Sequence, residues 1–322
     1  MYVKCNHRII IGKYRFRALE LVKASLSLNK VMQTAVIRVP ASAIIKRQDE
    51  RFTVDVSKEI KRKDAVSITL GYGDEMNLEW SGYVDHIDGG DMLEIRCANE
   101  AIFLREKDVD MEYLDKSLKE ILSDLVSDTG ITLASGIPDI NIRKWQAFDT
   151  TALDVIRQLK EKMMLVVFLL DRKLYAGVGY PQPGKTHLMR KGWNLADASG
   201  LNYESSQQRY TGVKAISYLK DGTKLEVEVG DQSGSVKTEL VYNVSDKESL
   251  KELAESRLGK YKEAGLKGSV EAFIQPVVKP GDKVKYEDPA YPDRTAGHLV
   301  QATEVIFDGN GLHRTIELGI EL

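Results

Sequence analysis

The clearest chemical signal in the sequence is the run Gly179-Tyr180-Pro181-Gln182-Pro183-Gly184-Lys185-Thr186. Its spacing matches the phosphate-binding loop G-x-x-x-x-G-K-[ST], in which backbone N–H groups and a lysine hold the phosphates of a nucleotide. The run also follows a predicted strand over residues 173–178, as such loops do. One hypothesis is therefore a nucleotide-binding enzyme that uses the loop from Gly179 to Thr186.

Three features of the same segment argue against nucleotide binding. Pro181 and Pro183 remove two of the N–H groups that would contact phosphate. A phosphate-binding loop opens directly into a helix, whereas the residues after Thr186 reach the next glycine too soon to form one. The predicted strands over residues 166–171 and 173–178 are joined by a tight turn and should pair antiparallel, unlike the parallel strands of a nucleotide-binding sheet. A surface loop rich in proline and glycine explains the segment better, and nucleotide binding stays a lesser alternative.

Histidine, cysteine and carboxylate residues form no further constellation with a recognisable spacing. The histidines share no metal-ligand spacing such as HxxxH, and each is expected at the surface or in a turn. They are His7, His86, His187, His298 and His313. Cys5 and Cys97 form no CxxC pair and are expected to be free thiols, although a disulfide could form if the two ends of the first domain met. We predict no catalytic, cofactor-binding or metal site. A pair of wall-cleaving carboxylates would leave no mark in one sequence, so a lysin stays an alternative.

Length and charge exclude several other classes of protein. The chain has 322 residues, a mass of 36.1 kDa and a formal net charge of −2. That length favours two or three domains, and that charge favours neither a nucleic-acid binder nor a membrane-surface binder. The longest apolar run, Met163 to Leu170, is far shorter than the roughly 20 residues of a membrane span. We therefore expect no specific nucleic-acid binding, no membrane insertion, no secretory signal and synthesis in the cytoplasm.

The elements that would position any site are mainly strands. Alternating residues over the first hundred positions, such as Val66, Ile68 and Leu70, predict half-buried antiparallel strands and a first β domain over residues 1–108, either a small barrel or a sandwich. Helical spacing over residues 118–125 and 151–162, followed by a hairpin, predicts an α+β domain over residues 109–180.

The second half of the chain follows the same logic. Residues 181–205, rich in proline and glycine, are expected to be a linker or long loop. A hairpin at Asp221-Gly222 and a helix between Asp246 and Ala264, ended by Gly265, predict a second β domain with one helix over residues 206–322. The predicted fold class is multidomain and mainly β, with two small β-barrel domains flanking an α+β domain.

Several segments, in the right order, resemble the late control protein D family. The first is Lys63 to Gly73, which ends in Leu-Gly-Tyr-Gly, followed by the strand Leu78 to Ile87 with Trp80, Gly82 and Val84. Further similar segments are residues 117–131, 150–159, 279–284, 298–300 and 311–318. The family includes baseplate hub proteins of contractile phage tails and the hub part of type VI secretion spike proteins.

The resemblance implies a structural rather than an enzymatic role. Hub proteins of this kind form homotrimers in which each subunit supplies two related barrels, so that a ring of six barrels joins the sixfold tail tube to the threefold central spike. The expected partners are the tail tube protein, the central spike protein and other baseplate subunits. The expected location is the virion tail, assembled in the cytoplasm of the host bacterium, where a prophage could encode the chain. A tail-associated cell-wall lysin is the alternative, and a nucleotide-binding enzyme the lesser one.

Overall fold

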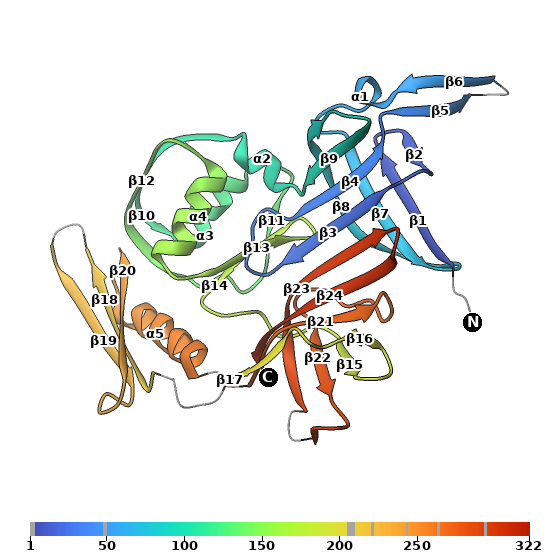
Figure 1. Cartoon of the computed structure of the whole chain (residues 1–322). Coiled ribbons are helices and arrows are strands. Elements are labelled where there is room, and N and C mark those ends of the chain that lie inside the picture. The colour runs from blue at the N-terminus through green and yellow to red at the C-terminus, as the bar shows by residue number, and fades with distance from the viewer. Residues whose placement is uncertain are drawn as a thin grey trace.

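The computed structural model describes residues 4–47, 50–204, 210–219, 222–242, 244–262, 265–292 and 295–322. It is mainly β, with one long, bent sheet and smaller layers of helices and strands beside it (Figure 1). The large sheet has 14 strands within these residues. Strands from both ends of the chain contribute to it, so the two termini belong to one structure.

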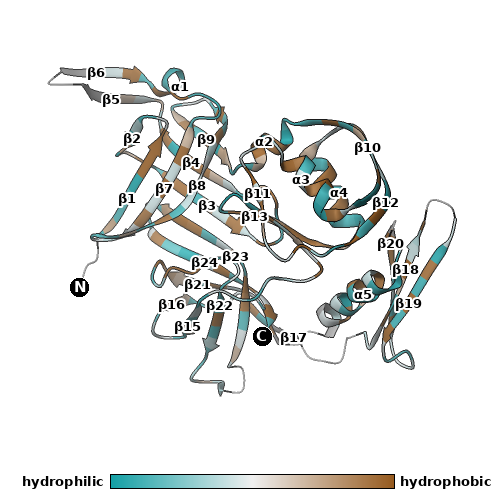
Figure 2. Ribbon diagram, turned by 180° about the vertical axis from the view of Figure 1, so that it is seen from behind, coloured by the Kyte–Doolittle hydropathy of each residue, from teal (hydrophilic) through white to brown (hydrophobic). Residues whose placement is uncertain are grey.

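The first hundred residues form one half of the large sheet, in the order β3-β4-β9-β8-β7-β1-β2. Alternation along these strands places apolar residues on one face, where Ile9, Ile68 and Ile95 are fully buried. Figure 2 shows hydrophobic and hydrophilic residues interspersed along these strands. The strand predictions for this region are therefore confirmed. Their bounds are β1 (Cys5–Ile11), β2 (Tyr14–Phe16), β3 (Leu21–Ser27), β4 (Thr34–Pro40), β7 (Ala65–Tyr72), β8 (Glu75–Asp88) and β9 (Met92–Ala98).

A projecting hairpin interrupts this half of the sheet. It consists of β5 (Ser42–Arg47) and β6 (Glu50–Asp55) and leads into the short helix α1 (Val56–Glu59). The side chain of Asp55 caps α1 by accepting a hydrogen bond from the backbone N–H of Ser57. The hairpin extends away from the body of the molecule in Figure 1.

The last part of the chain forms the other half of the large sheet. The long strand β23 pairs with β24, and its two ends pair with β22 and β3 respectively. The register with β3 runs from Ala302 opposite Ser27 to Phe307 opposite Val22, which joins the two halves by backbone hydrogen bonds. The bounds are β15 (Thr186–Arg190), β16 (Leu195–Asp197), β17 (Leu201–Glu204), β21 (Gly265–Phe273), β22 (Lys283–Glu287), β23 (Ala296–Asp308) and β24 (Gly311–Glu321).

Two expectations for this region are corrected. The two separate barrels are replaced, in the described part of the chain, by one continuous sheet without a closed barrel. Residues 181–205, expected to be a linker or long loop, contain β15, β16 and β17, which join this sheet through β22 and β21. Their short lengths and interspersed glycines hid these strands from a reading of local patterns.

The middle of the chain forms an α+β layer, as its sequence predicts. Ser117 and Glu120 form a capping box at the start of α3, and Thr151 caps α4. The predicted antiparallel pairing of the hairpin is confirmed by Leu170 opposite Lys173. The bounds are α2 (Ala101–Arg105), β10 (Asp108–Ser117), α3 (Leu118–Val126), β11 (Thr132–Leu133), β12 (Asn141–Thr151), α4 (Ala152–Lys162), β13 (Val166–Leu170) and β14 (Lys173–Gly177).

A second αβ layer lies outside the large sheet, although the sequence predicts it as part of the second barrel domain. It contains β18 (Gly212–Tyr218), β19 (Lys224–Gly230), β20 (Val236–Tyr242) and α5 (Lys247–Lys262). Asp246 caps the predicted helix, Gly265 begins β21, and Asp221 lies outside the described residues. The apolar residues of this layer share one core with the α+β layer, so residues 206–322 divide between two bodies. The domain boundaries at residues 108 and 180 stay a prediction.

Substitution of Leu312 by alanine tests whether the two halves of the sheet unfold together. Leu312 of β24 is buried in the core of the first half, and its carbonyl accepts a hydrogen bond from the Tyr72 hydroxyl at 3.0 Å. Leu312→Ala should lower the free energy of unfolding by about 2–5 kcal/mol and speed hydrogen exchange in β7 as well as β24. Leu240→Ala, at a half-exposed site on β20, should change stability by less than about 0.5 kcal/mol. If hydrogen exchange becomes faster only in residues 265–322, the two halves of the sheet do not unfold together.

Candidate functional site

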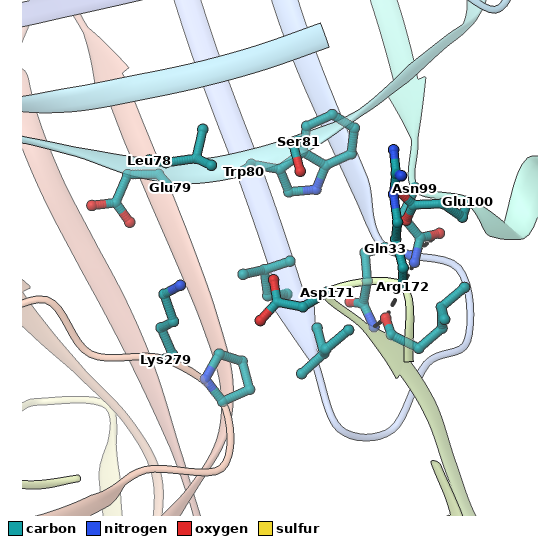
Figure 3. Close-up of a pocket in the computed structure, with 14 residues that line it drawn as sticks. Gln33, Leu78, Glu79, Trp80, Ser81, Asn99, Glu100, Asp171, Arg172 and Lys279 are labelled. Carbon is teal, nitrogen blue, oxygen red and sulfur yellow. Dashed lines mark hydrogen bonds and ion pairs between the residues drawn. The ribbon is translucent and has the colours of Figure 1, made fainter. Parts of the chain in front are cut away.

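A pocket of about 260 Å³ lies where the two halves of the large sheet meet the β13–β14 hairpin. In Figure 3, Trp80 and Ser81 of β8 lie above the pocket, and Asp171 and Arg172 of the hairpin turn lie below it. Lys279 lines it from the segment that precedes β22. Segments far apart in the sequence therefore converge on one polar hollow, which makes it the first place to look for chemistry.

The buried amides at one side of the pocket hold the β13–β14 hairpin against the large sheet. Asn99 Nδ2 donates to the carbonyls of Val31 and Leu169, both at 3.2 Å. Gln33 Nε2 donates to the Ser27 carbonyl at 2.9 Å and to the Lys30 carbonyl at 2.7 Å. Buried polar groups that are satisfied in this way fix the position of the backbone. Trp80, which also lines the pocket, has a buried Nε1 without a hydrogen-bond partner among the described residues.

An ion pair between Glu79 of β8 and Arg314 of β24 lies beside the pocket, and both side chains are almost fully buried. Arg314 Nη2 lies 3.0 and 2.9 Å from the two carboxylate oxygens, and its Nη1 donates to the Val278 carbonyl at 2.8 Å. Burial raises the pKa of Glu79, and the neighbouring Arg314 guanidinium opposes that rise. A raised carboxylate pKa is one mark of a catalytic acid, but here both oxygens are held by the arginine.

A second ion pair joins the hairpin turn to the first half of the sheet. Arg172 Nε donates to Glu100 at 3.1 Å, and its Nη2 donates to the Tyr83 hydroxyl at 3.2 Å. Asp171 and Arg172 both adopt positive φ values, 48° and 62°, which the tight turn between β13 and β14 requires. Of the carboxylates that line the pocket, Glu79 and Glu100 are thus engaged by arginines. This arrangement is that of a structural joint, and it gives a lysin mechanism no support.

The loop that matched the phosphate-binding pattern is folded in another way. Its Gly184 N–H donates to the Gly281 carbonyl at 2.8 Å, and its Lys185 N–H donates to Asp282 Oδ1 at 3.0 Å. A carboxylate of the same chain therefore occupies the place that a phosphate would take. Thr186 begins strand β15, which runs parallel to β22, so the required helix does not follow. The structure thus supports the argument against nucleotide binding at this loop.

The histidines lie apart from one another, and one expectation about them is wrong. His298 is not at the surface or in a turn but is buried in β23. His187 lies 3.0 Å from Asp282 Oδ2 and helps to hold the loop described above. Within the described residues, no group of three histidine, cysteine, aspartate or glutamate side chains could hold a metal ion. Cys5 and Cys97 are free thiols, as expected, and burial raises the pKa of Cys97 to about 12.

The helices that the structure describes include none long and apolar enough to cross a membrane.

The buried ion pair can be tested by a double-mutant cycle. Arg314→Met leaves the Glu79 carboxylate buried without a partner, so it should lower the free energy of unfolding by about 3–5 kcal/mol. Replacing both residues, as Glu79→Leu with Arg314→Met, should recover most of that loss in chemical denaturation. Lys116→Met, which breaks an exposed pair with Glu120, should cost no more than about 1 kcal/mol. A double variant as unstable as Arg314→Met would show that the pair is not the source of the effect.

His298 predicts how stability depends on pH. Burial lowers the pKa of His298 below the ordinary value of 6.5. The unfolded chain therefore binds a proton below pH 6.5 that the folded chain does not, and stability falls as the pH drops from 6.5 towards the lowered pKa. The loss from this group should reach at most about 1.4 kcal/mol per pH unit.

Melting temperatures between neutral pH and pH 5 measure this effect. His298→Leu should reduce the loss of stability in acid, and some loss should persist because burial also lowers the pKa of His7. An unchanged pH dependence in the variant would assign the acid sensitivity to other groups.

The comparisons with known proteins place this fold among tail proteins. The sequence matches no described protein family and no curated protein. A tail protein from Neisseria meningitidis MC58 superposes with a TM-score of 0.70 at 11% identity, over 99% of this chain and 96% of that one. The 43 kDa tail protein of prophage MuSo2 from Shewanella oneidensis gives a TM-score of 0.63 at 15% identity, over 98% and 97% of the two chains.

A third similar structure extends the comparison beyond phages. It is a component of the type VI secretion system of E. coli, described as structurally similar to tail proteins of bacteriophage T4. The TM-score is 0.57 at 11% identity, over 99% of this chain and 77% of that one. The chain therefore has the fold of phage tail proteins, which this component of the type VI secretion system shares.

Proposed function

We propose that the chain is a structural hub subunit in the baseplate of a phage tail or a related injection machine. The observation that carries the proposal is the match of almost the whole chain to almost the whole of two tail proteins. A match of that extent covers the sheet, both αβ layers and their order. Identities of 11% and 15% support a shared fold, and the role is our inference from it.

The large sheet divides into two halves. This division supports the proposal that each subunit contributes two bodies to the wall of a ring. The first half packs around one apolar core and the last strands pack around another, with Ile68 and Ile316 as fully buried examples. Two such bodies in one chain become six in a trimer. We propose that this trimer joins the sixfold tail tube to the threefold central spike. Its partners are then the tube protein, the spike protein and other baseplate subunits, in a virion tail assembled in the host cytoplasm.

The polar pocket supports a mechanical role rather than a reaction. Its arginines and amides connect segments that are distant in sequence. Arg314 connects β8 and β24, and Asn99, which follows β9, bonds Val31 before β4 and Leu169 of β13. A role as a tail-associated lysin would need a carboxylate pair free to act on a sugar, and the pocket offers none among its arginine-bound glutamates. A nucleotide-binding role would need the loop amides that Asp282 occupies.

The solution mass is the first test of this proposal. Light scattering after size exclusion should give a trimer of 3 × 36.1, about 108 kDa, since a hub ring needs a closed cyclic contact. Measurement over a wide range of protein concentration will separate a stable trimer from a weak one. A chain that remains a monomer both alone and with the cognate tube protein would exclude the proposed ring.

A further inference from the structure

One end of the molecule carries unpaired cations. Residues 4–17 contain five cations and no acid, namely Lys4, Arg8, Lys13, Arg15 and Arg17. Arg8, Lys13, Arg15 and Arg17 are exposed, and within the part of the chain that the structure describes none of the four has an ion-pair partner. We call these four residues the cationic end.

The backbone of β1 and β2 gathers these cations on one face. Ile9 and Ile11 point into the core, so Arg8 points outward, and Arg15 lies opposite Ile10 on the same outward face. One acid, Glu59, lies at this edge, where it accepts a hydrogen bond from the Tyr14 hydroxyl. The cations outnumber it, and the excess of like charges favours an acidic partner.

Over residues 108–115 the β10–β12 ribbon has the opposite charge, and it exposes apolar side chains. The facing strand β12 carries Arg143, Lys144 and Asp149. Residues 108–115 contain four acids and no cation, namely Asp108, Asp110, Glu112 and Asp115. Glu112 pairs with Lys144, whereas Asp108, Asp110 and Asp115 have no ion-pair partner within the described residues. Leu114 and Phe148 expose 56% and 55% of their surface. We call this surface, with Asp108, Asp110, Asp115, Leu114 and Phe148, the acidic ribbon.

The backbone of the acidic ribbon is shaped to present its apolar residues. Asp115 follows Leu114 and Asp149 follows Phe148, and both aspartates adopt positive φ values, 47° and 48°. Aspartate tolerates this left-handed conformation better than most residues, but it is uncommon and tends to persist where it serves a function. Exposed large apolar side chains rimmed by polar residues are typical of protein–protein contacts.

The two surfaces also share an open backbone edge. Strand β1 pairs with β7 along its whole length but with β2 only over Ile9 to Ile11, so on that side its first residues lack a partner strand within the described chain. Strand β10 pairs, among the described strands, with β12 alone. Unpaired edges of this kind can add a strand from another chain.

We propose that the cationic end of one copy of this chain binds the acidic ribbon of a second copy. The surfaces lie at opposite ends of the molecule in both Figure 1 and Figure 2, so they cannot meet within one chain. Their charges are complementary, and complementary patches steer and orient association. A contact between different surfaces is head to tail, and it closes into a ring when the rotation between copies permits. The inference adds a specific contact to the proposed ring. It rests on the proposed function only in assuming that copies of this chain associate.

Charge reversal on each surface, separately and together, tests the contact. Arg15→Glu with Arg17→Glu, and Asp108→Lys with Asp110→Lys, should each raise the apparent dissociation constant of self-association at least about tenfold. Mixing the two reversed proteins should restore one contact per pair, and a chain with all four changes should assemble like the wild type. Added salt should weaken the wild-type assembly.

Matched controls separate a lost contact from a lost fold. Arg190→Glu with Lys247→Glu reverses two exposed cations outside both surfaces and should leave the mass unchanged. The four changed positions are exposed, so circular dichroism and melting temperature should match the wild type.

The possible outcomes distinguish this inference from the proposed function. If the wild type is a trimer and each charge-reversed protein is also a trimer, the contact is wrong and the ring stands. If the wild type forms another oligomer that the reversals break and the combination restores, the contact stands and the threefold ring is wrong. Reversals that break assembly without restoration in the combined variant overturn the contact. A wild-type chain that stays monomeric at low salt, both alone and with the cognate tube protein, overturns both.

Discussion

The two halves of the large sheet depend on one buried interaction, the ion pair between Glu79 and Arg314. These residues lie 235 positions apart in sequence, and each is buried to a degree that water cannot solvate it. A charge in such a place is tolerated only when its partner is present, so the pair permits only arrangements in which β8 and β24 face each other. The pair need not add net stability to do this. Its effect is to raise the free energy of every arrangement that separates the two strands.

Backbone pairing completes what the ion pair specifies. Strand β3 and strand β23 pair over six positions, although the Ser25 hydroxyl and the Glu304 carboxylate that bond across them are 279 residues apart. Such distant contacts form late, because closing a long loop costs entropy before the contact is gained. The αβ layers share one core of their own.

Local patterns in the sequence predicted the elements and missed their partners. Alternation located β7 and β9, and helical spacing of apolar residues located α3 and α4. No local pattern indicates which strand β23 pairs with. The sequence therefore predicts two barrels where the structure has one continuous sheet. The pocket was missed for the same reason, since its parts are distant in sequence. One signal was present: Arg314 stands in phase with Leu312, Ile316 and Leu318, and an arginine on an otherwise apolar face needs a buried partner.

The shared strand β23 has a mechanical consequence. A hinge between two bodies requires a segment whose torsion angles can change without breaking contacts on either side. Here β23 pairs with β22 near its start, with β3 near its end and with β24 throughout, so any rotation between the halves would shear one of these ladders. The molecule can bend only as a sheet bends, by small changes of twist spread over many strands. A torque applied at one edge is thus passed to the other as elastic strain, with no loose joint to absorb it.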